Sequence, residues 1–324
     1  MRKGVALLLA ALLLTGCAGT PQSREAGRTL VVSVLGAETV DGRLRLTAAA
    51  EAREEGDSAQ IQGSGPTPAA AMEALAGGGD RVVSAAHVEH LLLDRAAADR
   101  LPALLDYAFR DPQQSTETQL WVVEGSFASV WEADPARRME VLKTAGRDRQ
   151  GFCPVTLRQA AGALAQGEPV LLPVVDGKTL ARTGAVLWDG ARFTARLDRN
   201  EALGAALLLG QRIHWTASAG EDAFSLRLVR CALRPRWKGD RLAGLTVACT
   251  LEGVRTGGDG GKSALEDRTA ETIRQALEKL RRANAGGLLL GRAGLAQPTR
   301  WRLLEAQWPR LFSALPVEVK VTVR

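Results

Sequence analysis

The chain has 324 residues, of which 42 are Lys or Arg and 36 are Asp or Glu, and its formal net charge is +6. Apolar residues make up 46% of the sequence, which is enough for sizeable hydrophobic cores, and this length predicts two or three domains. The basic residues are spread among acidic ones, so the composition carries no nucleic-acid signature and no nucleic-acid partner is expected.

The first segment combines a basic start with an apolar run that ends near a cysteine. Arg2 and Lys3 precede the run from Val5 to Leu14, which is shorter than the about 20 apolar residues needed to span a bilayer. The letters "LTGC", which end at Cys17, fit the lipobox of bacterial lipoproteins. Small residues before the cleavage site let the peptidase hold an extended backbone, and the cysteine thiolate accepts a diacylglycerol thioether.

These features predict how the protein is held. We expect a lipoprotein signal peptide over 1–16, cleavage between Gly16 and Cys17, and a diacylglycerol- and palmitate-bearing Cys17 followed by a flexible tether over 17–28. An ordinary secretory signal with a chance cysteine is the alternative. No later apolar run is long enough to span a bilayer, so we expect a protein that lies outside a membrane and is anchored by lipid.

The first half of the mature chain is predicted to mix short strands and helices. Residues 29–53 read as two strands joined by a turn at Asp41-Gly42, a pair typical of tight hairpins. Residues 134–151 are charged and irregular. Between them we predict a helix over 66–78, a buried strand over 82–94, an amphipathic helix over 95–111, a strand over 117–125 and a short helix over 126–133 capped by Ser126.

The second half opens with a helix and a strand and closes in the same way. We predict a hairpin over 179–198 that turns at Asp189-Gly190, and Trp301, Leu304, Trp308 and Leu311 form one apolar stripe of a helix. The full set comprises helices over 156–167, 199–211, 263–284 and 298–315, and strands over 169–177, 223–237, 241–254 and 316–323, besides the hairpin.

Strands and helices are mixed without strict alternation, which predicts an α+β fold. We expect a multi-domain protein with mostly antiparallel or mixed sheets flanked by helices. The predicted division is an N-terminal α/β domain over 29–175 and a C-terminal α/β region over 176–324 that contains two subdomains.

No motif in the sequence predicts catalysis or metal binding. The stretch "GGDGGKS" lacks the spacing of a phosphate-binding loop, because Thr256 occupies the place of its first glycine. His87 and His90 fall on a predicted strand and would point to opposite faces, which excludes a shared metal. No Gly-x-Ser-x-Gly elbow is present. We therefore expect a protein that is not an enzyme and has no metal or other cofactor.

Three cysteines remain besides Cys17, and their wide spacing is a poor disulfide framework. Cys231 and Cys249 fall in two predicted strands and could pair if those strands are neighbours. Simple buried thiols are the favoured interpretation of both, and Cys153 has no predicted partner.

Several segments in the same order resemble the Ger(x)C family, the GerAC-type lipoprotein C subunits of spore germinant receptors. Residues 87–133 resemble a histidine-led strand, a helix, an Arg-Asp-Pro hinge and a second strand of that family. Residues 184–210 resemble its strand hairpin and leucine-rich helix. Residues 300–323 resemble its closing tryptophan-spaced helix and valine-alternating strand.

The resemblance implies a three-domain assembly of sheets and helices on the outer face of the inner spore membrane. It implies complexes with an A-type and a B-type membrane subunit, and a non-enzymatic role in receptor assembly and germination signalling. Arg110, Asp111 and Pro112 are candidate partner-contact residues, with a simple helix stop as the alternative. An extracytoplasmic solute-binding lipoprotein of a transport system is the alternative function, and a lipoprotein hydrolase is a weaker one.

Overall fold

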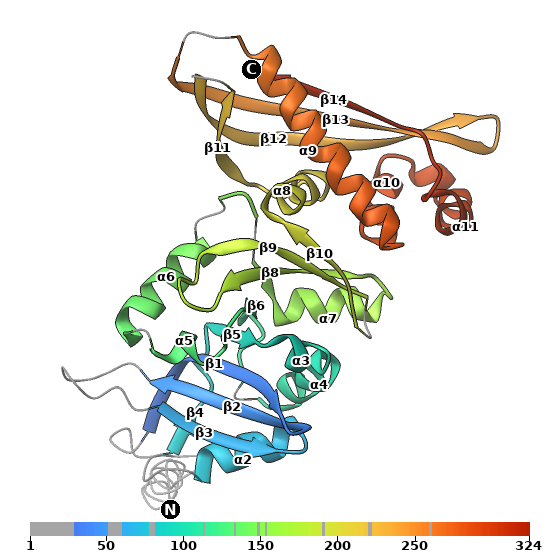
Figure 1. The fold of residues 1–324 in the computed structure, drawn as a ribbon. Helices are drawn as coiled ribbons and strands as arrows, with labels where there is room; N and C mark the ends of the chain where they lie inside the picture. The colour runs from blue at the N-terminus through green and yellow to red at the C-terminus, as the bar shows by residue number, and fades with distance from the viewer. Residues whose placement is uncertain are drawn as a thin grey trace, which may run out of the picture.

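The computed structural model describes residues 29–50, 60–77, 82–112, 114–132, 134–147, 150–152, 154–189, 192–219, 222–258 and 261–324. Gly16 and Cys17, the predicted cleavage and lipidation residues, therefore lie outside the described residues, as does Cys153. The described part of the chain forms two stacked units, which we call the N-terminal unit (29–198) and the C-terminal unit (199–324) (Figure 1).

The N-terminal unit is built on a ten-stranded mixed sheet with the order β10-β9-β8-β6-β5-β1-β2-β3, in which β4 also pairs with β1 and β7 with β6. The strands are β1 (Thr29–Val40), β2 (Arg43–Ala50), β3 (Gln60–Gly65), β4 (Val82–Ser84), β5 (His90–Leu93), β6 (Gln119–Glu124), β7 (Val155–Thr156), β8 (Val170–Asp176), β9 (Arg182–Trp188) and β10 (Phe193–Asp198). The predicted domain division at 175/176 falls between β8 and β9 of this sheet, and it stays a prediction.

Helices cover both faces of this sheet. The larger of its two cores contains the helix residues Leu75, Leu104 and Leu157. The smaller core, on the opposite face, contains the helix residues Val130 and Leu142. The helices of the larger core are α2 (Pro68–Gly77), α3 (Arg95–Ala98), α4 (Leu101–Arg110) and α7 (Leu157–Ala165), and those of the smaller are α5 (Ser129–Glu132) and α6 (Pro135–Arg147).

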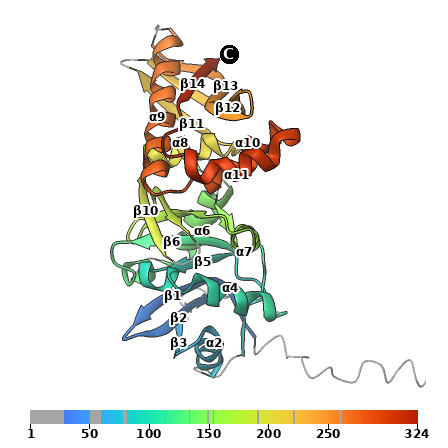
Figure 2. The ribbon, with the colours of Figure 1, turned by 90° about the vertical axis from the view of Figure 1, so that its right-hand side faces the viewer.

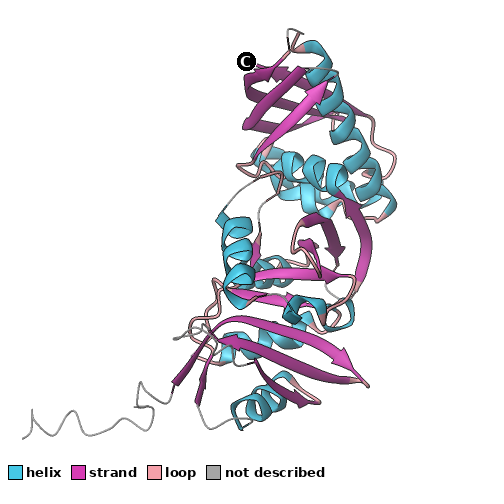
Figure 3. Cartoon of the chain, turned by 60° about the vertical axis from the view of Figure 1, so that its left-hand side comes forward, coloured by secondary structure: helices cyan, strands magenta, loops and turns pink. Residues whose placement is uncertain are grey.

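The C-terminal unit is built on a four-stranded sheet with the order β11-β12-β13-β14. Its strands are β11 (His214–Ala219), β12 (Asp222–Lys238), β13 (Arg241–Gly257) and β14 (Val317–Val323), and its helices are α8 (Arg199–Leu208), α9 (Ser263–Arg282), α10 (Gly287–Leu295), the 3-10 turn η2 (Pro298–Arg300) and α11 (Trp301–Leu311). The helices lie on one face of the sheet, as Figures 2 and 3 show from two sides, and the other face is open.

One helix belongs to the packing of both units. α8 is buried nearly all round, because Ala205, Leu207 and Leu208 leave little surface exposed. α8 belongs to a hydrophobic core that also contains Leu187 and Leu197 of the first sheet and the apolar face of the second sheet. A helix that is apolar all round must be covered on every side, and here the two sheets and α9 provide the cover.

The predicted fold class, α+β with mixed sheets flanked by helices, is confirmed. The first hairpin is confirmed too, since Asp41 and Gly42 have φ of 49° and 74° between β1 and β2, as a tight two-residue turn requires. The second hairpin, the helices over 156–167, 199–211 and 263–284, and the closing strand are present within a few residues of their predicted bounds.

Three local predictions are wrong. Residues 135–147 form helix α6 and are not irregular, because its Met139, Leu142 and Ala145 pack against the sheet core and compensate for a largely charged sequence. The predicted strand over 82–94 is two strands, since β4 pairs with the start of β1 while β5 pairs further along it. The predicted helix over 95–111 breaks after Ala98, and Pro102 lies in the first turn of the second piece.

Candidate functional site

A cleft of about 840 Å³ lies where the two units meet. Its walls come from α6, the segment 150–152 and β9 on one side, and from α8, β11 and α9 on the other. Two hydrogen bonds join the segment 150–152 to its neighbours in the cleft. Gly151 N–H donates to His214 O at 2.8 Å, and Arg182 Nη1 donates to Phe152 O at 2.9 Å. The size falls in the range of small-molecule sites, about 300–1,000 Å³.

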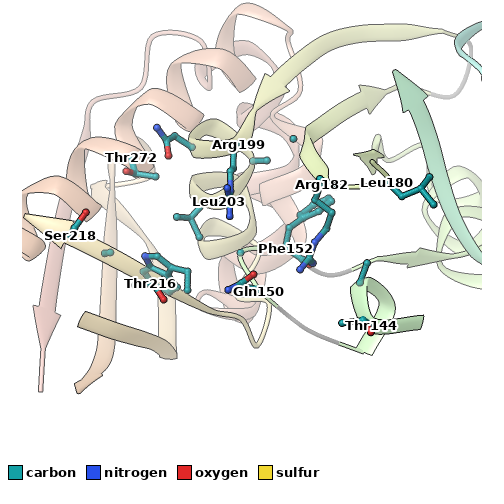
Figure 4. Close-up of a pocket in the computed structure, with 18 of the residues that line it drawn as sticks. Thr144, Gln150, Phe152, Leu180, Arg182, Arg199, Leu203, Thr216, Ser218 and Thr272 are labelled. Carbon is teal, nitrogen blue, oxygen red and sulfur yellow. The ribbon is translucent and has the colours of Figure 1, made fainter. Parts of the chain in front are cut away.

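Charge in this cleft is strongly one-sided. Four arginines from four elements line it, against one carboxylate, that of Glu140; they are Arg137 of α6, Arg182 of β9, Arg199 of α8 and Arg268 of α9. Within the described part of the chain, Arg137, Arg199 and Arg268 form no ion pair. Figure 4 shows the side chains of Arg182 and Arg199 extending toward Gln150 from the two sides of the cleft.

Apolar side chains also line the cleft. Phe152, Leu180, Trp215 and Leu265 are buried and line the cleft together with the half-buried Leu203. Hydroxyl groups lie among them on Thr144, Thr216, Ser218, Thr269 and Thr272. An apolar surface beside arginine and hydroxyl donors accommodates a molecule that combines an apolar body with an anionic group.

A second groove shows what compensated charge looks like in this protein. The groove of about 490 Å³ along α9 is lined by seven charged residues, against five in the cleft, but its cations have partners. Lys279 lies 3.5 Å from Glu201, Arg274 lies 3.1 Å from Glu271, and Arg282 lies 3.0 Å from Glu278. The excess of positive charge is therefore a property of the cleft between the units and not of every groove on the surface.

His90 is the buried titratable group of the first sheet. Its Nδ1 accepts a hydrogen bond of 3.1 Å from Trp121 Nε1, and its Nε2 has no hydrogen-bond partner among the residues that the structure describes. Burial, assisted by the charge of Lys143, lowers the pKa of His90 to about 4, so the imidazole is neutral at pH 7. His87 lies in a turn outside the strands, so the prediction that both histidines share one strand is wrong. No three described His, Cys, Asp or Glu side chains come together as a metal site requires.

The candidate partner-contact residues lie together at the end of α4. Arg110 Nε donates to Asp106 Oδ1 at 2.8 Å, with both side chains largely exposed, and Asp111 accepts a hydrogen bond of 2.9 Å from the Tyr107 hydroxyl. Pro112 is exposed in the following turn. This geometry ends the helix with Arg110 and Pro112 exposed and Asp111 half-buried.

The cleft was not predicted from the sequence. Its arginines are spread from residue 137 to residue 268, and nothing in their local spacing marks them as a group. One signal was available: residues 199–324 hold 21 Lys and Arg against 12 Asp and Glu, whereas residues 17–198 hold 19 against 24. Counting charged residues separately in these two segments would have shown that the C-terminal one is basic.

Comparison with known proteins gives two findings. A family model described as the spore germination protein N-terminal domain matches residues 22–176. Among solved structures, the crystal structure of the GerBC protein is similar with a TM-score of 0.57 and 13% sequence identity, over 89% of this chain and 96% of that chain. A search of the curated proteins finds no significant match.

No described helix is long and apolar enough to cross a membrane.

Proposed function

We propose that this chain belongs to the Ger(x)C, or GerAC-type, family of spore germination proteins and is a lipid-anchored, non-enzymatic C subunit of a germinant receptor that acts in receptor assembly and germination signalling. The observation that carries the proposal is the match of residues 22–176 to the family's N-terminal domain, together with a GerBC-like fold over most of the chain. Its predicted division, with an N-terminal domain over 29–175 and a two-part region over 176–324, belongs to the same proposal.

The proposed anchor is Cys17, after cleavage between Gly16 and Cys17. The motif "LTGC" supports it, and the following tether over 17–28 leads directly into β1. β1 to β3 lie at the end of the molecule away from β12 to β14 (Figures 1 and 2). The anchor therefore holds the N-terminal unit close to the outer face of the inner spore membrane and directs the C-terminal unit away from it.

The proposed partners are the A-type and B-type membrane subunits. An anchor on the same membrane raises the effective concentration of this chain around them, so weak contacts suffice for assembly. The Arg110-Asp111-Pro112 turn is the proposed contact on the N-terminal unit.

The test is a pull-down of the tagged chain, solubilised in mild detergent from sporulating cells. We expect recovery of two multi-span membrane proteins of the A and B types. Recovery of a permease with its ATPase instead would favour the solute-binding lipoprotein. Cys17→Ala is expected to leave the membrane fraction, and a fully processed Cys17→Ala chain that stays there would remove the anchor from the proposal.

A matched pair of variants tests the contact turn. Arg110 and Arg282 each form an exposed i,i+4 ion pair, of 2.8 Å with Asp106 and 3.0 Å with Glu278. Arg110→Glu is expected to reduce recovery of the membrane subunits while Arg282→Glu leaves it unchanged. Equal recovery with both variants would mean that the turn only ends α4.

A further inference from the structure

We propose that the cleft between the two units binds a small organic anion, a carboxylate attached to an apolar body. The proposal goes beyond the function above and does not depend on it. It starts from the four arginines and one glutamate that line the cleft, a formal charge of +3 within one concave site. Proteins tend to balance like charges in a confined space, and Arg137, Arg199 and Arg268 have no ion-pair partner among the described residues.

The geometry of the donors favours a carboxylate. Arg199, at the first turn of α8, and Arg137, on α6, have no side-chain hydrogen-bond or ion-pair partner among the described residues, so their guanidinium groups are available to a ligand. Arg268 differs, because it donates to the Ser218 carbonyl and is held in place along β11. A planar guanidinium donates two parallel hydrogen bonds to a carboxylate, which makes arginine the preferred residue for such anions.

Partly exposed apolar side chains supply the second half of the recognition. Val141, Leu203 and Ala217 are half-buried and line the cleft together with the arginines. An inorganic anion would leave these side chains in contact with water, whereas a ligand with a ring or an alkyl body would cover them. The preferred ligand is therefore an aromatic or branched carboxylate and not a bare phosphate.

A ligand in this position contacts both units. Arg137 and Arg182 belong to the N-terminal unit, and Arg199 and Arg268 to the C-terminal unit. One anion between them brings together groups that otherwise repel each other, so it stabilises the joint between the units. Binding then reduces the motion of one unit relative to the other, and this change couples ligand binding in the cleft to the binding of partners by each unit.

The experiment is a titration of the mature chain, purified in non-ionic detergent, at constant ionic strength set with chloride. Isothermal titration and thermal unfolding are measured with benzoate, glutarate, acetate and phosphate, and with benzamide as the uncharged analogue of benzoate. We expect benzoate to bind in the millimolar range or more tightly, ahead of acetate and phosphate, and benzamide to bind undetectably. Phosphate binding as strongly as benzoate, or no binding by any carboxylate, would overturn the proposal.

Matched variants locate the site. Arg199→Gln removes an exposed arginine without a partner and is expected to weaken benzoate binding by about tenfold, with an unchanged unfolding midpoint in the absence of ligand. Arg137→Gln provides a second such variant. Arg282→Gln, in the compensated groove along α9, is the control and is expected to bind benzoate like the parent chain. Equal binding by all three variants would overturn the proposed site.

An independent observation points to a modification site in the C-terminal unit. Cys231 of β12 and Cys249 of β13 are directly opposite each other in the antiparallel register, and in the structure they are free thiols whose Sγ atoms are 2.6 Å apart. Both are buried on the helix-covered face of the sheet. We infer that they form a cross-strand disulfide, the pairing that the sequence left as the less favoured alternative.

The reaction is a thiol–disulfide exchange with a dissolved disulfide compound as the oxidant. The thiolate of one cysteine attacks the oxidant and releases one of its halves as a thiol, leaving a mixed disulfide. The second cysteine thiolate then attacks that mixed disulfide, forms the Cys231–Cys249 bond and releases the other half. Two cysteine thiols are oxidised, one external disulfide is reduced to two thiols, and the cysteine protons end on those thiols.

The exchange belongs to folding and not to the finished fold. The contact with Cys231, together with burial, raises the pKa of the Cys249 thiol, so the reactive thiolate is scarce once the sheet is covered. The two strands form a hairpin with a turn at Gly239-Asp240, and they can bring the sulfur atoms together before the helices pack.

Thiol counting tests the disulfide. The mature chain is refolded with oxidised glutathione, then alkylated in denaturant with and without reductant, and its peptides are weighed. We expect a linked peptide pair whose mass is lower by two hydrogen atoms, with Cys153 alkylated throughout. Alkylation of all three thiols without reductant, or a link that involves Cys153, would overturn the inference. Cys231→Ser is the control and is expected to leave Cys249 free.

Discussion

The two units of this protein differ in how their sheets are covered and in the sign of their charge. The ten-stranded sheet has helices on both faces, whereas the four-stranded sheet has helices on one face and an open opposite face. Residues 17–198 have a net charge of −5, from 19 Lys and Arg against 24 Asp and Glu. Residues 199–324 have a net charge of +9, from 21 against 12.

The open face explains part of this asymmetry. Along β12, Arg227, Arg230, Arg234 and Arg236 are exposed, whereas Leu226, Leu228 and Leu233 are buried under the helices. A strand with one face in water alternates in this way, while the strands β5, β6 and β8 of the covered sheet are apolar at nearly every position. The coverage of a sheet thus decides how much charge its strands can carry, and the C-terminal unit carries arginine there.

The first and largest prediction tests whether the units are separately stable. Trp121 of β6 is fully buried in the N-terminal unit, and Trp121→Ala is expected to lower the free energy of unfolding by about 3–5 kcal/mol, because a large cavity remains. Hydrogen exchange should then rise in β5, β6 and β8, while β12 and β13 keep their protection. Equal loss of protection in both sheets would show that the units unfold as one.

The second prediction concerns pH and is confined to the N-terminal unit. His90 binds a proton only near pH 4 in the folded chain, against about 6.5 in the unfolded chain. Between these values the unfolded state binds more protons, so stability is greatest above pH 6.5 and falls by up to about 1.4 kcal/mol for each unit of decrease in pH toward 4.

Urea unfolding at pH 7 and pH 5 measures this dependence. His90→Leu is expected to be less stable than the parent at pH 7, since Trp121 Nε1 loses its acceptor. Its free energy of unfolding is expected to fall much less than that of the parent between pH 7 and pH 5. His87→Gln, in an exposed turn, is the control and keeps the parent dependence. A parent-like pH dependence in His90→Leu would assign the effect to other groups.

The third and smallest prediction concerns the contact between α8 and α9 within the C-terminal unit. Gly204 of α8 packs directly on the backbone of α9, where an added Cβ would overlap the Thr272 carbonyl oxygen. Gly204→Ala is expected to lower the free energy of unfolding by about 1–3 kcal/mol, because the two helices must move apart. The measurement is the shift in the urea midpoint.

A helical glycine without such a contact serves as the control. Gly162 of α7 has open space where its Cβ would lie, so Gly162→Ala is expected to raise stability by about 0.5–1 kcal/mol through helix propensity alone. If both substitutions shift stability in the same direction, close packing at Gly204 does not hold α8 against α9.

Local chemistry made several elements predictable. The helix over 156–167 begins at Thr156, whose hydroxyl accepts the Gln159 N–H while the Gln159 side chain accepts the Thr156 N–H. Asp198 caps α8 in the same manner with Glu201. These signals, like the Asp41-Gly42 turn, act within a few residues, so they can be read directly from the sequence.

Other elements depend on contacts that are distant in sequence. β11 was not predicted, since it forms by pairing along β12, and over residues 214–218 its one deeply buried side chain is that of Trp215. α6 has a charged sequence and forms a helix that packs on the sheet core. α10 was not predicted either, and its Leu289 and Ala293 are buried in the core beneath the second sheet.

By itself, the sequence determined the alternation of strands and helices, most of their bounds, the α+β class and the family likeness, because capping, turn residues and apolar periodicity act over short distances. Only the tertiary structure decided that α8 lies between two sheets, that Cys231 faces Cys249, and that arginines from four elements share one cleft. The physical reason is that strand register and helix packing join residues far apart in the chain, and these contacts are selected by burial of the whole core.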